Sequence, residues 1–267
     1  MRVAAHQPGY HRHLYYFYKM AISDVFVSLD HVQFARSEWQ NRQVFVYEGA
    51  RRWLTVPVRG SRGTIRAKVI ADLSILQSHW NRIRSIYQNT PHFDTYEASL
   101  AEIYGASWTY LNDLCDALTH VVRNGLGITT PYLRASDLIG ETKATKGAML
   151  ADAALGAADA MTKTSCDSFV TYLACSNPVS KNHYLCQPSR EDPALAEYQV
   201  MENRGVHVRT FDYLHPGYAQ AQHVPGYPFQ AELTAYDLLF NHGPKARDIL
   251  LGSHFERRPK LYPIGVK

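Results

Sequence analysis

The chain has 267 residues, of which 46% are hydrophobic and 19% charged, as expected for a globular protein with a substantial core. Its net charge of +4, without any lysine- or arginine-rich run, is too small for a nucleic-acid-binding protein but suits an anionic small molecule. The N-terminus lacks an apolar signal segment, and the longest apolar stretch, 149–161, is interrupted by two aspartates. We therefore expect a cytoplasmic protein that binds neither nucleic acid nor membranes.

The first forty residues predict a strand–helix–strand unit. Residues 3–5 and 25–29 are short apolar runs typical of buried strands, and 14–22 is apolar and aromatic at helical spacing. Polar groups follow both strands, beginning with His6 after the first and Asp30 after the second. Because ligands collect at the carboxyl ends of parallel strands, these groups predict a site there. Any one of them alone would be read more simply as a turn residue.

The rest of the chain continues to alternate strands and helices. The strand-like runs cover 43–47 and 53–58, which form a hairpin, and then 65–70, 129–133, 168–174 and 206–211. The helical patterns cover 74–88, 96–104, 108–126, 141–158 and 235–240. This alternation predicts an α/β fold with a mixed or mostly parallel sheet and flanking helices. A helical insertion around 74–126 fits into a single domain over 1–267.

Six short motifs occur in order over most of the chain. They are Gln7-Pro8-x-Tyr10, Asp24-Val25-Phe26-Val27-x-Leu29-Asp30-x-Val32-Gln33-Phe34, Trp39-x-Asn41-Arg42, Trp53-Leu54-Thr55-Val56-Pro57-Val58, His215-Pro216-x-Tyr218-x-Gln220 and Asp237-Leu238-Leu239-Phe240-Asn241-x-Gly243-Pro244. Together they resemble the WbqC-like family, bacterial proteins whose genes often accompany O-antigen and amino-sugar biosynthesis. The resemblance implies one WbqC-like domain that catalyses glycyl or other acyl transfer. The chain departs from the family pattern at Arg12-His13, where Pro-Trp is usual, and over 163–200.

The leading hypothesis is therefore transfer of an acyl or aminoacyl group to a small-molecule amine, or closure of a lactam. The donor would be a thioester of coenzyme A or of a carrier protein, and no cofactor is expected. A nucleotide-dependent ligase is one alternative, although the phosphate-loop glycines that it would need are missing. A non-catalytic binding protein of a biosynthetic complex is another.

Acyl transfer to an amine needs a base, donors for the oxyanion and anchors for both substrates. His6 and His215, together with His31, are the candidate bases, because imidazole titrates near neutral pH. Asp30 and Asp237 would orient a histidine or bind an ammonium group, unless they only cap a turn and a helix. The expected substrate contacts are Gln7, Tyr10, Gln33, Asn41, Arg42, Tyr218, Gln220 and Asn241.

These residues are expected to assemble at one edge of the sheet. We predict that Gln7, Asp30, Asn41 and Arg42 line one pocket, because each lies just beyond a predicted strand. The C-terminal motifs around His215 should close the same site. The cleft would have acidic groups and the carbonyls of the helix that ends at 241–243 on one wall, and Arg42 and amide donors on the other.

Cysteine and metal chemistry are the remaining possibilities. Cys175 follows a predicted strand and has His183 nearby in sequence, so it is a candidate nucleophile for a Cys–His acyl transfer. Against this role, the family pattern has no cysteine there, and unpaired cysteines are usually inert. His6, His11 and His13 with Asp30 could bind a metal ion, but we rank this below acyl transfer and expect no metal.

Overall fold

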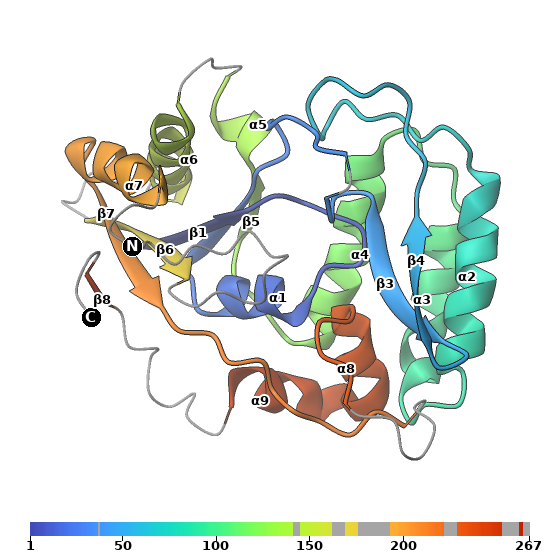
Figure 1. Ribbon diagram of the computed structural model, residues 1–267. Coiled ribbons are helices and arrows are strands. Elements are labelled where there is room, and N and C mark those ends of the chain that lie inside the picture. The colour runs from blue at the N-terminus through green and yellow to red at the C-terminus, as the bar shows by residue number, and fades with distance from the viewer. Residues whose placement is uncertain are drawn as a thin grey trace.

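The structure is a computed structural model that describes residues 1–36, 38–140, 145–161, 169–175, 193–221, 229–252 and 262–263. Its main sheet has the order β5-β2-β1-β6-β7-β8 (Figure 1). The first five strands are parallel, and β8 is antiparallel to β7. The strands are β1 (Arg2–His6), β2 (Val25–Ser28), β5 (Tyr132–Arg134), β6 (Val170–Cys175), β7 (Val206–Phe211) and β8 (Tyr262–Pro263). The expected α/β fold with a mostly parallel sheet is confirmed.

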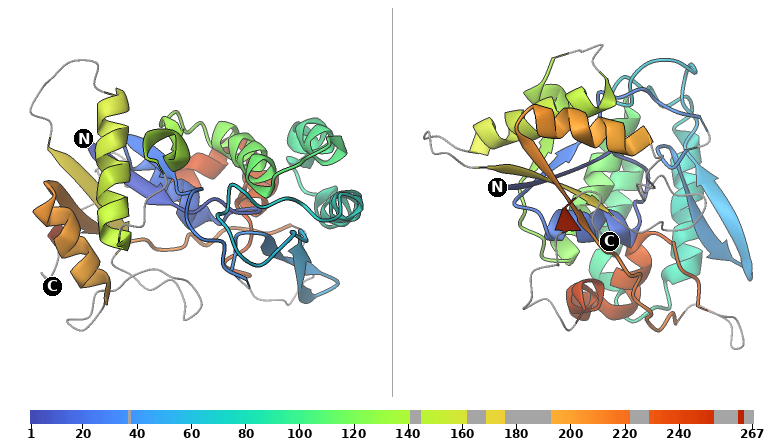
Figure 2. Two further views of the ribbon diagram at one scale, coloured as in Figure 1. Left: turned by 90° about the horizontal axis from the view of Figure 1, so that it is seen from above. Right: turned by 60° about the vertical axis from the view of Figure 1, so that its left-hand side comes forward.

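The central strands are buried on both faces. Successive side chains of a strand point to opposite sides of the sheet, and both sides are covered. Val3 and Val25 pack against alanine-rich α6 (Lys146–Met161) and α7 (Pro193–Asn203). Ala4 and Phe26 enter a second core, which contains the aromatic residues of α1 (Leu14–Ala21). Figure 2 shows α6 and α7 on one side of the sheet and α1 on the other. Burial on both faces explains why these strands read as continuous apolar runs.

The predicted strand–helix–strand unit forms the middle of the sheet. β1 and β2 pair in parallel, with Val3 opposite Val25 and His6 opposite Ser28, and α1 connects them. The carboxyl ends of both strands therefore lie at the same edge, as the sequence predicts. No helix in the described parts of the chain is long and apolar enough to cross a membrane.

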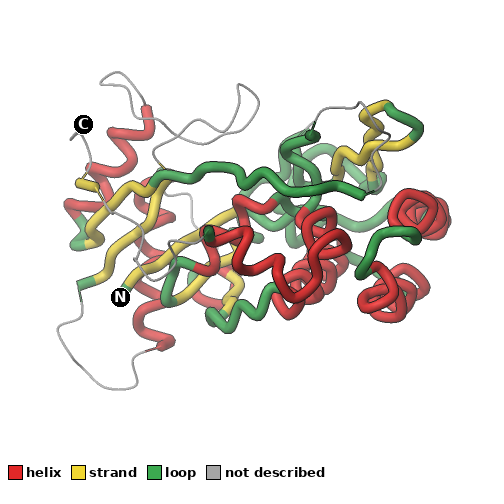
Figure 3. Tube along the Cα trace, turned by 90° about the horizontal axis from the view of Figure 1, so that it is seen from below, coloured by secondary structure: helices red, strands yellow, loops and turns green. Residues whose placement is uncertain are grey.

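Helices form the other half of the molecule. In sequence, α2 (Ser74–Tyr87), α3 (Phe93–Gly105) and α4 (Leu111–Gly125) lie between β4 and β5, where the helical insertion is predicted. The short helix α5 (Ala135–Leu138) follows β5 directly. Near the C-terminal end come α8 (Ala235–His242), a 3₁₀ turn at Gly243–Lys245 and α9 (Ala246–Leu251). Figure 3 shows the long loop after β7, which leads from the sheet towards these helices.

The predicted hairpin forms a separate two-stranded sheet of β3 (Arg42–Tyr47) and β4 (Ala50–Thr55). It packs on α2, where the Arg82 guanidinium lies 5.1 Å from the centroid of the Tyr47 ring. The strand predicted at 65–70 is wrong. This segment makes only isolated bridges, such as Val69 with Tyr110 and Ile70 with Val58. Neighbouring residues pair with different segments, so no continuous strand forms.

Candidate functional site

A pocket of about 350 Å³ opens at the carboxyl ends of β1, β6 and β7. Its walls include His6 from β1, Ala174 from β6, and Tyr213 and His215 from the loop after β7. Further walls come from α1, α6, α7 and the loop over 35–40. Both the volume and the position at the strand ends are typical of a site for a small molecule.

Two half-buried histidines in this pocket are held in the same way. His6 Nδ1 lies 3.1 Å from the Gln7 carbonyl oxygen, and His215 Nδ1 lies 2.9 Å from the Pro216 carbonyl oxygen. A carbonyl oxygen can only accept, so Nδ1 carries the proton in each ring and Nε2 keeps a lone pair. His215 Nε2 has a long contact, 3.5 Å, with the Glu232 backbone N–H. Each ring therefore presents Nε2 as an acceptor.

Burial keeps both imidazoles neutral near pH 7. The pKa of His6 lies well below its ordinary value because of burial and, secondly, the positive charges of Arg12 and Lys19. Burial also lowers the pKa of His215, although the Glu232 carboxylate acts in the opposite direction. The groups that lower the pKa of His6 include two cations, whereas a carboxylate raises the pKa of His215.

Two buried cations line the same pocket. The Arg12 guanidinium donates through Nη2 to the carbonyl oxygens of Gln7 and Pro8, at 2.5 and 2.7 Å. Lys19 Nζ donates to the Ala5 carbonyl oxygen at 2.9 Å, and lies 5.4 Å from the centroid of the Tyr172 ring. Carboxylates also border the pocket, at Glu38, Glu197 and Glu232. The site thus offers partners for both negative and positive groups.

Gln7 connects the pocket with the loop over 35–40. Its Oε1 accepts a hydrogen bond from Gln40 Nε2 at 2.8 Å, while Gln40 Oε1 accepts from the Ala35 backbone N–H at 2.9 Å. Since the oxygen of Gln7 is engaged, this side chain presents its amide hydrogens as donors. An amide N–H of this kind can donate to a developing oxyanion.

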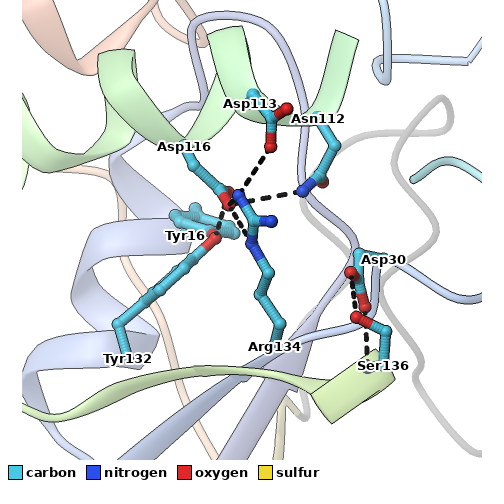
Figure 4. A network of polar contacts seen from close by, with 8 residues as sticks. All are labelled: Tyr16, Asp30, Asn112, Asp113, Asp116, Tyr132, Arg134 and Ser136. Carbon is cyan, nitrogen blue, oxygen red and sulfur yellow. Dashed lines mark hydrogen bonds and ion pairs between the residues drawn. The ribbon is translucent and has the colours of Figure 1, made fainter. Parts of the chain in front are cut away.

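Asp30 does not line the pocket, although the sequence predicts that it does. It is buried, and its carboxylate accepts hydrogen bonds from the Ser136 backbone N–H at 3.0 Å and the Ser136 hydroxyl at 2.6 Å (Figure 4). These contacts tie the end of β2 to the first turn of α5, which is the structural alternative noted for an aspartate after a strand. Figure 4 also shows the neighbouring network in which Arg134 pairs with Asp113 and Asp116.

The other residues expected beside Gln7 are dispersed. Asn41 Nδ2 donates to the Val56 carbonyl oxygen at 2.8 Å, the Arg42 guanidinium lies 4.2 Å from the centroid of the Trp53 ring, and Gln33 is exposed. The prediction that Asp30, Asn41 and Arg42 share a pocket with Gln7 is therefore wrong. Asn41 and Arg42 lie at the start of β3, which belongs to the separate hairpin, so they do not meet the strand ends of the main sheet.

Among the C-terminal motifs, His215 reaches the pocket and the others support its loop. Buried Asp237 accepts hydrogen bonds from the Tyr87 hydroxyl at 3.1 Å and from Gln220 Nε2 at 2.8 Å. Asn241 Oδ1 accepts from the Ala221 backbone N–H at 2.6 Å. The Tyr218 ring stacks with that of His215 at 6.3 Å between centroids. The two-walled cleft with Arg42 and the α8 terminus is thus not what the structure shows.

Tyr10 does not line the pocket. It is buried, and its hydroxyl bonds with His79 Nδ1 at 2.8 Å and with the Tyr104 hydroxyl at 2.7 Å. His11 bonds to Tyr104, whereas His13 lines the pocket, so the two do not converge on one ion. His31, the third candidate base, is not among the residues that line the pocket. Within the described residues, no three histidine, cysteine or acidic side chains are grouped as metal ligands.

The cysteine hypothesis stays a prediction. Cys175 is the last residue of β6 and pairs with Phe211. Its side chain and His183 lie outside the part that the structure describes.

Sequence reasoning missed the basic part of the pocket. Arg12 is noted only as a departure from the family pattern, and Lys19 only as part of a helix, although both line the pocket. One signal was available for Lys19. It is the single charged residue in the apolar and aromatic stretch 14–22, and such a lysine on a buried helix marks a polar site.

The WbqC-like protein family matches residues 7–249. The chain is 26% identical over 254 residues to the protein Rv1507c of Mycobacterium tuberculosis (strain ATCC 25618 / H37Rv), which is described as uncharacterized, and the match covers 93% of this chain and 97% of that protein. No solved structure matches the chain. The family match covers most of the sequence, and the chain belongs to the WbqC-like protein family.

Proposed function

We propose that this protein transfers an acyl or aminoacyl group to a small-molecule amine, or closes a lactam, in the pocket at the ends of β1, β6 and β7. A thioester of coenzyme A or of a carrier protein would be the donor. The observation that carries the proposal is the pair of neutral imidazoles, His6 and His215, which present Nε2 in one small-molecule pocket. Membership of the family is compatible with a transferase but names no reaction.

In the proposed reaction the amine nitrogen attacks the thioester carbonyl, so that a C–N bond forms and the carbonyl oxygen becomes negative. His215 Nε2 takes the proton that the nitrogen must lose, and Glu232 stabilises the imidazolium. The Gln7 amide donates to the oxyanion. When the C–S bond breaks, the thiolate leaves and receives the proton from His215.

The two histidines differ in the charges around them, and this separates their roles. Arg12 and Lys19 oppose a positive charge on His6, which therefore stays neutral and serves as a hydrogen-bonding wall of the pocket. His215 has a carboxylate neighbour instead. The base is accordingly assigned to His215.

The test is detection of the product. The purified protein is incubated with acyl- and aminoacyl-coenzyme A donors and a set of small amines, and mass spectrometry follows the amide and the free thiol. Amide formed in proportion to released coenzyme A supports the proposal. Thiol released equally without amine would indicate a hydrolase, and saturable binding of donor or amine without any product would indicate a binding protein.

A further inference from the structure

Arg12 is a charged group buried beside the pocket. Its exposed fraction is 7%, and none of the ion pairs between described residues includes it. Among the described residues its hydrogen-bond partners are the carbonyl oxygens of Gln7 and Pro8, both bound by Nη2. Burying a guanidinium without a counter-ion costs free energy, so the fold retains a positive charge that its own described carboxylates do not neutralise.

The surroundings of Arg12 fix the guanidinium in place. A Cβ on Gly9 would lie 2.5 Å from the Trp39 carbonyl oxygen and 2.7 Å from Arg12 Cζ, so only glycine leaves room for the guanidinium there. The Tyr16 ring centroid lies 5.7 Å from Arg12 Cζ. Arg12 Nε is buried and has no hydrogen-bond partner among the described residues. Nη1 makes no hydrogen bond to a described residue either, so its N–H groups are the ones that a ligand in the pocket could engage.

A second cation reinforces the positive character of this part of the pocket. Lys19 is also buried, with 5% of its surface exposed, and it lines the same cavity. The Glu38 carboxylate is the weakest of the groups that act on the pKa of Arg12. Glu197 is engaged by the backbone N–H of Gly147. Arg12 and Lys19 are thus two buried cations that line the pocket, and they attract an anionic group more strongly than a neutral one.

We infer that the ligand of this pocket carries a carboxylate or phosphate group, which Arg12 binds through Nη1 with Lys19 as a second positive charge. A planar, fixed guanidinium suits both anions. Calling this ligand a substrate rests on the function proposed above, but the binding of the anionic group does not. Arg12 is then a specificity-determining residue that selects an anionic small molecule over its neutral analogue.

The experiment measures binding alone. The melting temperature is followed as sodium phosphate or sodium succinate is added, each compared with sodium chloride at equal ionic strength. The wild type should gain stability saturably with at least one of the two anions, because a ligand that binds only the folded state stabilises it. The anion that gives the gain identifies the ligand as phosphate or carboxylate.

Variants assign the effect to Arg12. Arg12→Lys and Arg12→Gln should weaken the apparent anion affinity tenfold or more. The matched control is Arg204→Gln, which removes the same charge from an exposed ion pair with Asp152 and should bind as the wild type does. Anion binding is measured without donor or amine, so loss of anion binding is told apart from loss of turnover. An unchanged affinity in Arg12→Gln, or a wild type that responds to both anions only as to chloride, would overturn the inference.

A measurement on the wild type covers the case in which the Arg12 variants fail to fold. The buried Nε–H of Arg12 should give a slowly exchanging ¹H–¹⁵N signal, which shifts when phosphate or succinate binds at Nη1 of the same guanidinium. A guanidinium Nε–H signal that shifts saturably in wild type and Arg204→Gln supports the inference. The absence of any such shift at saturating anion contradicts it.

Discussion

His6 and His215 come from opposite ends of the chain, yet they line one pocket and hold their imidazoles alike. In each, Nδ1 contacts the carbonyl oxygen of the following residue, Gln7 or Pro216, which leaves Nε2 as an acceptor. The parallel sheet explains their meeting, because β1 and β7 flank β6 and end at the same edge. The difference between their charged neighbours is the reason why we propose His215 as the base.

Gly9→Ala should damage the pocket through a single methyl group. The added Cβ would clash with the Trp39 carbonyl oxygen and with Arg12 Cζ, so the loop or the guanidinium must shift. We expect a loss of about 1–3 kcal/mol in unfolding free energy, together with weaker anion binding. Gly140→Ala is the control, since nothing lies within 4 Å of its Cβ position. Equal stability and equal anion affinity in the two variants would show that Gly9 and Trp39 do not hold the Arg12 guanidinium tightly.

Asp237→Ala should act on stability and much less on the chemistry of folded molecules. It leaves the Tyr87 hydroxyl without its acceptor and removes one of the two acceptors of Gln220 Nε2, at a cost of about 3 kcal/mol in urea unfolding. Exposed Asp159→Ala should stay within about 0.5 kcal/mol of the wild type. If Asp237→Ala folds as stably as the wild type but loses turnover, Asp237 acts in the chemistry after all.

Buried histidines should make the protein less stable in acid. Burial lowers the pKa of His11 to about 3 and that of His79 to about 4. Below pH 6.5 the unfolded chain therefore binds protons that the folded chain does not, and stability falls as pH decreases. Each histidine contributes a slope of up to about 1.4 kcal/mol per pH unit between these limits.

His11→Asn isolates one of these groups, and asparagine tolerates the backbone φ of 52° at this position. Urea unfolding between pH 4 and 6.5 should show a shallower pH dependence for the variant. Parallel curves for variant and wild type would mean that His11 is already protonated in the folded protein.

Cys175→Ser should keep most of the activity, because the proposed route uses a histidine base and no thiol nucleophile. Mass spectrometry of the protein after exposure to the thioester donor without amine should find no added acyl group. An acyl group attached at Cys175, lost when the amine is added, would replace this route with covalent Cys–His transfer.

The sequence was most informative where one face or both faces of an element are buried. The apolar runs at 3–5, 25–29 and 206–211 mark strands of the sheet, and the strand ends correctly predict where His6, Gln7 and His215 gather. In such elements burial determines which positions are apolar, so the pattern of apolar residues reveals the element. The sequence alone therefore places these residues at one edge of the sheet.

The sequence could not distinguish polar residues that follow a main-sheet strand from those that belong to another sheet or cap a helix. Asn41 and Arg42 begin the hairpin, and Asp30 holds the first turn of α5 at Ser136. Arg12 was missed because its role depends on the packing of Gly9, Gln7 and Pro8 around one guanidinium. That packing is a property of the tertiary structure, not of spacing along the chain.

The central claim is that His215 Nε2 removes the amine proton. The direct test is kcat/KM for amine-dependent thioester cleavage by His215→Ala, with and without added imidazole, beside His242→Ala, whose ring contacts the Ala219 carbonyl oxygen outside the pocket. We expect His215→Ala to lose roughly 10²–10⁴-fold with little change in melting temperature, and imidazole to restore part of the rate. His242→Ala should retain its turnover. Wild-type turnover in folded His215→Ala, or an equal loss in both variants that imidazole does not relieve, would contradict the account.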